Sequence, residues 1–188
     1  MMMMHEIETE RLRLRMFKED DLEELYLIFG DPQVMKYLPG GQPRTREATA
    51  IGLTRTIEGF KKRGFGIWAA THKEQGTLLG YCGLVFLDDT PEIELLYGFA
   101  SKYWGAGYAT EAARACLRYG FEQLKFERIV AITRPQNTAS QRVLEKIGMR
   151  FEKAANYYDN DVNYFSISPE AYRADDALYV LREISSED

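Results

Sequence analysis

The order of hydrophobic and polar positions along the chain predicts alternating strands and helices. Leu12 and Leu14 alternate with arginines, so segment 7–16 is expected to be a strand with one polar face. Apolar residues then recur at helical spacing over residues 18–29, where acidic residues occupy the first turn. A second helical stretch is expected over about 45–62, between two glycine-containing breaks. The front of the chain is thus predicted to be one strand followed by two helices.

The middle and the end of the chain contain further strand patterns, separated by turn-forming residues. The expected strands are 65–71, 78–87, 93–100 and 128–133, with a closing hairpin of 151–158 and 162–167 that turns across 159–161. Helices are expected at about 110–124 and at 139–147, the latter ended by Gly148. A last helix is predicted to begin at Ser168 and Pro169, and it would place Ala177, Leu181 and Ile184 on one face.

No linker or internal repeat divides the sequence, so residues 1–188 are predicted to form a single α/β domain. Its core is expected over about 7–167, followed by a C-terminal helical extension over 168–188. The apolar stripe of that extension would cover its own core or form a dimer contact. A monomer and a homodimer are therefore both compatible with the sequence.

Composition and charge narrow the possible partners and the compartment. The formal net charge of −5 and a pI near 5.3 argue against a basic nucleic-acid-binding surface. No apolar stretch is long enough to span a bilayer, and the opening residues lack the apolar run of a secretory signal. Cys82 and Cys116 form no disulfide framework or zinc-binding spacing, and His5 and His72 do not favour a metal site. We expect a cytoplasmic protein with no metal, nucleic-acid or membrane partner.

The segment from the strand at 93–100 to the following helix carries the clearest chemical signal. Gly105 and Gly107 allow the backbone to approach a ligand closely, and the start of the helix leaves N–H groups free. Together these features are typical of a phosphate-binding or pyrophosphate-binding site. Tyr108 stands where a Walker loop would need lysine, and Thr110 replaces the third glycine of a dinucleotide fingerprint. Taken alone, the two glycines are equally compatible with a tight turn.

The wider context resembles one superfamily. The run Lys102-Tyr103-Trp104-Gly105-Ala106-Gly107 resembles the R/Q-x-x-G-x-G/A pyrophosphate loop of the GNAT N-acetyltransferases, with Lys102 in place of Arg or Gln. Residues 137–140 and 143–149 resemble the N-x-x-S and LEKxGF segments of that family. Residues 9–15 and 31–35 match its branch of ribosomal-protein alanine and serine acetyltransferases, the RimJ/RimL type. The resemblance covers about residues 7–167 in order, which is far more specific than any single motif.

The resemblance implies an α/β fold that binds acetyl-CoA. It implies a central mixed, twisted sheet of about seven strands, flanked by helices on both faces and splayed into a V between the strands at 93–100 and 128–133. The pantetheine arm would lie beside Tyr97, Gly98 and Phe99. The remaining expected cofactor-binding residues are Lys102, Tyr103, Trp104, Gly105, Ala106, Gly107, Tyr108, Ala109, Thr110, Asn137 and Ser140. Asn137 could equally be a plain helix N-cap, and Trp104 is expected to pack on the loop.

Acetyl transfer to an amine needs a base and a proton donor for the departing thiolate. Glu94 is the expected base, because it matches a glutamate common in this branch, and Glu92 would lie on the same strand face and could raise its pKa. Both could instead be solvated acids. Leu144 occupies the position of the family's general-acid tyrosine, so Ser140 is the expected substitute, with a local helix bond as the alternative. Both cysteines are interpreted as small buried residues, which predicts direct attack in a ternary complex without an acetyl-enzyme.

The acceptor is less well defined by the sequence. The resemblance implies that the acceptor is bound by the first helices, segment 37–47 and the closing hairpin. The aromatic and apolar candidates in these regions and in the strand at 65–71 are Tyr37, Leu38, Trp68, Tyr157, Tyr158 and Tyr164. The acidic balance suits a cationic amine. Protein N-terminal amines are the first expectation by analogy, and small amines the second. A non-catalytic acyl-CoA-binding or sensor module is the alternative from a different class, which the missing tyrosine permits.

Overall fold

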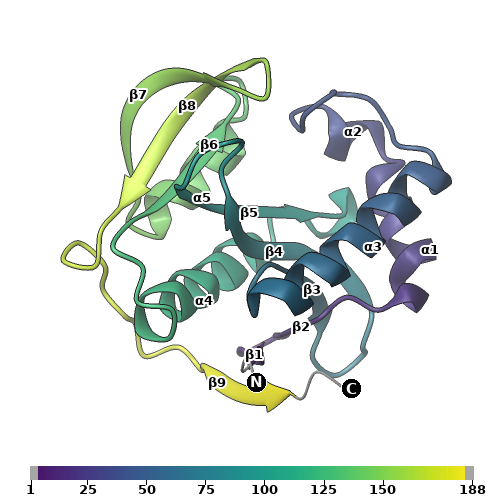
Figure 1. The fold of residues 1–188 in the computed structure, drawn as a ribbon, viewed down its shortest axis with the longest axis horizontal. Helices are drawn as coiled ribbons and strands as arrows, with labels where there is room; N and C mark the ends of the chain where they lie inside the picture. The colour runs from purple at the N-terminus through teal and green to yellow at the C-terminus, as the bar shows by residue number, and fades with distance from the viewer. Residues whose placement is uncertain (1–3, 185–188) are drawn as a thin grey trace.

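One mixed sheet of nine strands runs through the computed structural model, which describes residues 4–184 (Figure 1). The strands are β1 (Met4–Glu8), β2 (Leu12–Arg15), β3 (Ile67–His72), β4 (Leu78–Phe86), β5 (Ile93–Phe99), β6 (Ile129–Thr133), β7 (Arg150–Tyr157), β8 (Asn160–Ile167) and β9 (Val180–Ile184). Their order across the sheet is β7-β8-β6-β5-β4-β3-β2-β1-β9. The sheet therefore has two more strands than the expected number of about seven.

Helices cover both faces of the sheet, as expected (Figure 1). They are α1 (Leu22–Phe29), α2 (Pro32–Met35), α3 (Arg46–Arg63), α4 (Tyr108–Glu122) and α5 (Thr138–Lys146), with short 3₁₀ turns at Glu19–Asp21 and Ser101–Tyr103. On one face, Leu25 of α1 and Leu53 of α3 pack with Tyr81 of β4. On the other face, Leu117 of α4 and Leu144 of α5 join the main core. Burial of these apolar stripes is what fixes the helices on the sheet.

The sheet opens between its two parallel strands. β5 and β6 are paired at one register position, Glu94 with Val130, whereas β6 and β8 pair continuously from Ile129 to Thr133. Every other neighbouring pair in the described sheet is antiparallel. β5 and β6 therefore diverge beyond Glu94, which gives the V-shaped opening that the sequence resemblance implied.

The N-terminal segment forms two strands rather than the single strand expected over 7–16. Leu12 and Leu14 point into the core with 0% exposure, as their alternation predicts. The chain turns just before them, where the Thr9 amide donates to the carbonyl of Leu12 at 2.9 Å. β1 and β2 then pair antiparallel, and β1 gains an outer edge of its own. That free edge explains the next difference.

The predicted C-terminal helical extension over 168–188 is wrong within the described residues. The chain makes a turn after Ser168 and then forms β9, which pairs antiparallel with β1 from Met4–Ile184 to Glu8–Val180. Strand β1 otherwise has unpaired backbone groups at the sheet edge, and β9 satisfies them. Residues 185–188 lie outside the described range. Because no terminal helix forms over 168–184, it cannot supply the dimer contact considered from the sequence.

Membrane crossing can be addressed for the helices of residues 4–184. None of them combines the length and the apolar character needed to traverse a bilayer.

Candidate active site

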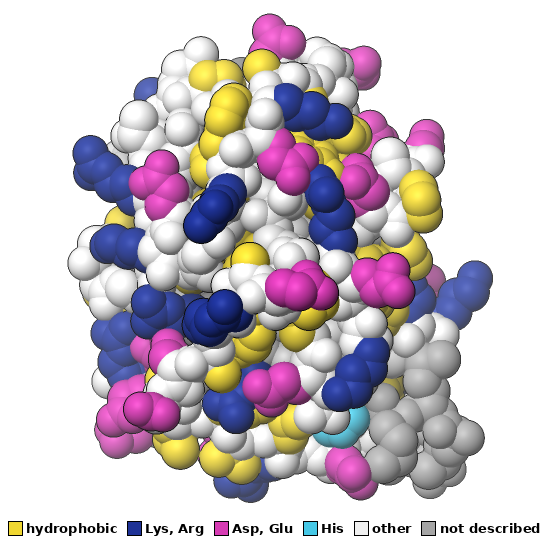
Figure 2. Space-filling model, turned by 90° about the vertical axis from the view of Figure 1, so that its left-hand side faces the viewer, with side chains coloured by type: hydrophobic (Ala, Val, Ile, Leu, Met, Phe, Trp, Pro, Cys, Tyr) yellow, Lys and Arg dark blue, Asp and Glu magenta, His cyan; other side chains and the backbone are white. Residues whose placement is uncertain are grey.

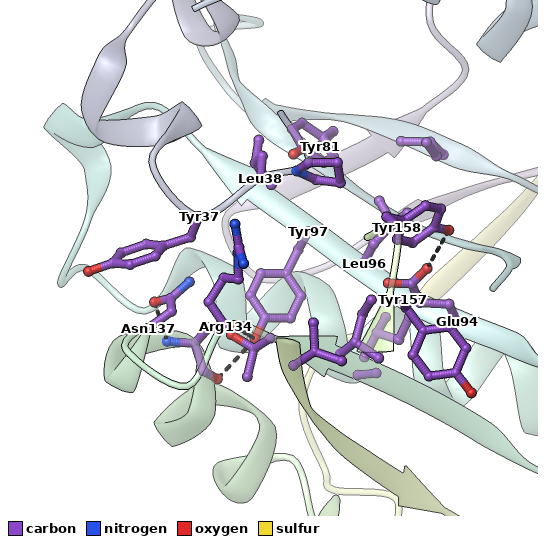
Figure 3. Close-up of a pocket in the computed structure, with 18 of the residues that line it drawn as sticks. Tyr37, Leu38, Tyr81, Glu94, Leu96, Tyr97, Arg134, Asn137, Tyr157 and Tyr158 are labelled. Carbon is purple, nitrogen blue, oxygen red and sulfur yellow. Dashed lines mark hydrogen bonds between the residues drawn. The ribbon is translucent and has the colours of Figure 1, made fainter. Parts of the chain in front are cut away.

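A cavity of about 300 Å³ opens where β5 and β6 diverge (Figure 3). Its walls come from α1, the α2–α3 segment, β5, the β6–α5 connection and the β7–β8 hairpin. The residues that were expected at a catalytic or acceptor site and that line it are Tyr37, Leu38, Glu94, Tyr97, Asn137, Ser140, Tyr157 and Tyr158. The fold thus brings together residues from five separate parts of the chain, at a volume typical of small-ligand pockets.

Two aromatic residues expected near the acceptor do not line this cavity. Trp68 has 0% exposure and packs edge-on against Phe60 and Tyr119 in the main core. Tyr164 has 1% exposure, and its hydroxyl donates to Glu92 Oε1 at 2.5 Å. Both are packing residues, because strand alternation turns their side chains into the protein interior.

Glu94 is buried in the cavity wall on β5. The residue is only 6% exposed, and this burial raises the pKa of its carboxyl from 4.5 to about 8. The carboxylate receives one hydrogen bond, from the Tyr158 hydroxyl to Oε2 at 3.4 Å, which opposes that rise in pKa (Figure 3). A carboxyl with a pKa near the working pH can both accept and release a proton.

Tyr158 reaches Glu94 from the tip of the closing hairpin. The hairpin turns at Tyr158 and Asp159, both with positive φ (50° and 57°), rather than across 159–161 as expected. Positive φ at both central residues is typical of a type I′ turn, whose twist matches the twist of the two strands that it joins. The Asp88 amide donates to the Tyr158 hydroxyl at 2.8 Å, and the Tyr158 amide donates to Asp88 Oδ2 at 3.3 Å. The hairpin and the β4–β5 turn therefore close over Glu94.

Asp88, rather than the expected Glu92, is the second carboxylate that acts on Glu94. The negative charge of Asp88 contributes to the raised pKa of Glu94, after desolvation. Glu92 instead bonds with Tyr164 and does not line the cavity. The predicted pair of Glu92 and Glu94 is therefore not formed as an electrostatic unit.

The opposite end of the cavity contains a pair of hydroxyl groups. Tyr97 Oη lies 2.9 Å from Ser140 Oγ and donates to the Ser140 carbonyl at 3.1 Å. Burial raises the pKa of the Tyr97 phenol, so this group stays protonated. Leu144 lies one turn further along α5 with 1% exposure, also in the cavity wall. The contact between Tyr97 and Ser140 was not predicted, since the two residues are 43 positions apart.

Asn137 begins α5 as its N-cap. Its side-chain oxygen accepts a hydrogen bond from the Ser140 amide at 3.2 Å, as the capping interpretation predicted. The cap fixes the first turn of α5, and with it the position of Ser140. Asn137 also lines the cavity, so the cap leaves its amide group facing a potential ligand (Figure 3).

The glycine loop leaves β5 and enters α4 at Tyr108, two residues before the expected start. Gly105 and Gly107 have φ values of 77° and 84°, a region that L-residues rarely adopt. Gly107 is the N-cap of α4. Because glycine has no side chain, no N-cap side chain accepts a hydrogen bond from the first amides of this helix. Trp104 is anchored to this segment by a hydrogen bond, in which its Nε1 donates to the carbonyl of Phe99 at 2.8 Å, while the residue stays 52% exposed.

A brace that sequence reasoning missed holds this loop. Glu111 accepts from Thr9 Oγ1 at 2.7 Å and pairs with Arg11 Nε at 2.7 Å. Arg11 in turn donates to the carbonyl of Ala106 at 2.8 Å and lies 4.3 Å from the centroid of the Tyr108 ring. The motif at 9–15 thus supports the loop from a distant part of the chain, and only its family match could have indicated this.

The cysteines lie in the core. Cys82 and Cys116 are both 0% exposed, and their sulfurs are 3.3 Å apart as free thiols. Burial raises the pKa of Cys116 well above its ordinary value, which disfavours the nucleophilic thiolate. This environment agrees with their interpretation as small buried residues.

The chain belongs to the GNAT family of acetyltransferases, because the family model for the acetyltransferase (GNAT) domain matches residues 11–150. It is accordingly an N-acetyltransferase that uses acetyl-CoA and binds an acetyl acceptor. Among curated proteins, YkkB of Bacillus subtilis (strain 168) is 38% identical over 157 residues, which cover 82% of this chain and 90% of YkkB.

Solved structures agree with this assignment. A GNAT-family acetyltransferase from Bacillus anthracis superposes with a TM-score of 0.77 at 34% identity, covering 88% of this chain and 99% of that chain. RimL, a ribosomal L7/L12 alpha-N-protein acetyltransferase solved in complex with coenzyme A, gives a TM-score of 0.73 at 18% identity. That match covers 87% of this chain and 97% of RimL, and it concerns the fold.

Proposed function

We propose that this enzyme acetylates a protein N-terminal amine by direct attack within a ternary complex, with Glu94 as the base. The observation that carries the proposal is the desolvated Glu94 carboxyl, whose pKa of about 8 places its titration close to neutral pH. An alkyl amine is mostly protonated at that pH, so the amine must lose a proton before it can attack. Glu94 takes that proton, directly or through a water, while the new C–N bond forms.

The residues present fit acetyl-CoA as the cosubstrate. Thr133 is 6% exposed at the end of β6, and its Oγ1 has no hydrogen-bond partner among residues 4–184. It lines the cavity across from β5, where a pantetheine amide would satisfy it. Residues 103–110 would hold the pyrophosphate through backbone amides, and Tyr97, Gly98, Phe99 and Asn137 would line the arm. Bound there, acetyl-CoA supplies the activated acetyl group.

Ser140 is the proposed proton donor to the CoA sulfur. Its hydroxyl faces the cavity 2.9 Å from the Tyr97 hydroxyl, which holds the Ser140 side chain in position. This pair takes the place of the tyrosine that Leu144 replaces. In the proposed step Glu94 takes one proton from the amine, the C–N bond forms and the C–S bond breaks, and Ser140 gives its proton to the sulfur. The second proton of the attacking nitrogen restores the Ser140 hydroxyl, so the products are the amide, the free thiol and one proton on Glu94.

The acceptor class rests on analogy with RimL, whose name specifies an N-terminal acceptor. The test is thiol release from acetyl-CoA with a panel of peptides bearing free N-termini, beside small amines and N-terminally blocked peptides. We expect release with free peptides and an added mass of one acetyl group on their N-termini. Release with small amines alone would assign the enzyme to that acceptor class. Binding of acetyl-CoA without release by any amine would instead indicate a non-catalytic acyl-CoA-binding module.

A further inference from the structure

The charge inside the cavity is opposite to the charge of the chain. The chain carries a formal net charge of −5, and the face in Figure 2 shows basic and acidic side chains intermixed. The charged residues that line the cavity are Arg44, Arg134 and Glu94. Two basic side chains and one acidic side chain therefore line the cavity, so its balance of charge is the reverse of that of the whole chain.

Arg44 is held in place without a charge partner. It lies in the segment before α3, half-buried, with its guanidinium carbon 4.5 Å from the centroid of the Phe29 ring. Within residues 4–184 its side chain makes no ion pair and no hydrogen bond to another side chain. Stacking fixes the plane of the guanidinium while leaving its N–H donors free.

Arg134 enters the cavity from the other wall. It directly follows β6, three residues before the N-cap Asn137 of α5, and its side chain extends toward the Tyr37 and Leu38 segment (Figure 3). Like Arg44 it is half-buried and without an ion pair among the described residues. Several other arginines have carboxylate partners, such as Arg15 with Asp21 at 2.7 Å. The arginines outside the cavity that form no ion pair within residues 4–184 are Arg55, Arg63, Arg142, Arg150 and Arg173.

We infer that Arg44 and Arg134 bind a carboxylate of the acceptor, so that the substrate is a primary amine with an acidic group close to the amine. This inference rests on the proposed function. Both guanidiniums line the same cavity and have no ion-pair partner among the described residues, so their N–H donors are available to a carboxylate, which arginine binds in a bidentate manner. The same chemistry would serve the side chain of an acidic residue next to a peptide N-terminus, or the α-carboxylate of a free amino acid. The inference adds an acidic group to the cationic amine that the charge balance of the sequence suited.

The test uses matched acceptor pairs that differ only in one carboxylate. One pair is a C-terminally amidated peptide beginning Ala-Glu and its Ala-Gln counterpart; the other is alanine and alaninamide. We measure kcat/KM for thiol release at saturating acetyl-CoA. The inference predicts a preference of about tenfold or more for the acidic member of at least one pair. The pair that shows it identifies whether the carboxylate comes from a side chain or from the α-position.

Variants then assign the preference to the two arginines. Arg44→Gln and Arg134→Gln are expected to lower kcat/KM for the acidic acceptor about tenfold or more and to abolish most of the preference, with KM for acetyl-CoA unchanged. Arg44→Lys should retain part of it, since it keeps the charge but not the bidentate fork. Arg46→Gln is the matched control: Arg46 is paired with Glu23 outside the cavity, and the preference should persist.

Each contrary outcome has a distinct meaning. Equal rates within both acceptor pairs would overturn the carboxylate inference while leaving the proposed function intact. A raised KM for acetyl-CoA in Arg44→Gln and Arg134→Gln would show that the arginines bind the cosubstrate's phosphates instead. Thiol release from no probe at all, with acetyl-CoA still stabilising the protein against heat, would overturn the proposed function and the inference with it.

Discussion

The two ends of the cavity are built from the same physical effect and suit opposite tasks. At one end, burial raises the pKa of the Glu94 carboxyl to about 8, into the range where it exchanges protons with an amine. At the other end, burial raises the pKa of the Tyr97 phenol, which moves it further from ionisation. Desolvation thus makes a proton acceptor of the carboxyl, whereas it keeps the phenol protonated as a hydrogen-bonding group. The difference lies in the starting pKa of each group rather than in its degree of burial.

The hydrogen bonding of the two ends differs in the same sense. Among the residues that the structure describes, the Glu94 carboxylate receives a single long hydrogen bond of 3.4 Å, so little stabilises its charged form. Tyr97 has two contacts with Ser140, at 2.9 and 3.1 Å, so its hydroxyl is held in place. A weakly bonded acid keeps a raised pKa, whereas a firmly bonded hydroxyl keeps a fixed position. Substitutions at each end can test whether this division of roles is real.

Replacing Glu94 should have the largest effect. Glu94→Gln removes the base with little change in shape, and we expect kcat/KM to fall by about 10² to 10⁴ at pH 7 to 8. In the unsubstituted enzyme, kcat/KM should rise about tenfold per pH unit below the Glu94 pKa of about 8, and this limb should vanish in the variant. An unchanged pH profile in Glu94→Gln would remove Glu94 from the mechanism.

Thermal unfolding provides the control for this variant. A carboxyl whose pKa rises from 4.5 to about 8 on folding contributes stability at low pH that is lost as the pH rises through the higher value. Glutamine carries no charge at any of these pH values. Glu94→Gln should therefore unfold at the same or a higher temperature than the unsubstituted protein at pH 9, which would exclude misfolding as the cause of the lost activity.

Replacing the hydroxyl pair should cost less. We expect Ser140→Ala and Tyr97→Phe each to lower kcat by about tenfold, because a thiolate with a pKa near 8.5 leaves without much help from an acid. The double variant should be hardly worse than either single one, since the two groups act as a unit. Thr138→Ala, in the same helix turn but outside the cavity wall, is the control. Additive losses would show two independent roles.

The sequence indicated candidate residues of this site but not the residues that surround them. Glu94, Ser140 and Asn137 were chosen because each matches a position of the GNAT resemblance, and the structure places all three in one cavity. Their partners come from far along the chain: Tyr158 is 64 positions from Glu94, and no local pattern links the two. In the sequence, Arg44 likewise has no feature that marks it beyond being a charged residue just before a helix. Its lack of a partner is a property of the folded molecule.

The terminal elements show the same limit for the fold. The spacing of Ala177, Leu181 and Ile184 fits a helix, yet the last two lie on a strand. The outcome depends on β1, whose edge is free only because the chain turns at Thr9 and Arg11 to meet Glu111. Elements whose partners are adjacent in sequence, such as β3 to β5, were placed to within a few residues. Long-range pairing is what periodicity cannot reveal.

A smaller effect should follow from the contact between Tyr158 and Glu94. Tyr158→Phe removes the hydrogen bond that favours the charged carboxylate, so the pKa of Glu94 should rise and the acidic limb of the kcat/KM profile should move to higher pH. The rate at pH 7 should fall by less than about tenfold and recover at pH 9. Tyr26→Phe, on α1 and outside the cavity wall, is the control. A loss that persists at pH 9 would mean that Tyr158 mainly contacts the acceptor.

The smallest effect should come from Asp88, and its sign should be opposite. The negative charge of Asp88 raises the pKa of Glu94, so Asp88→Asn should lower that pKa and increase the rate at pH 7 by about twofold. Asparagine tolerates the positive φ of 48° at this position and keeps an oxygen for the Tyr158 amide, so the turn should be retained. Raising the salt concentration should screen the difference. If Asp88→Asn and Tyr158→Phe shift the acidic limb in opposite directions, the limb reports the ionisation of Glu94 itself. A shift in the same direction would mean that both variants act by loosening the hairpin over the cavity.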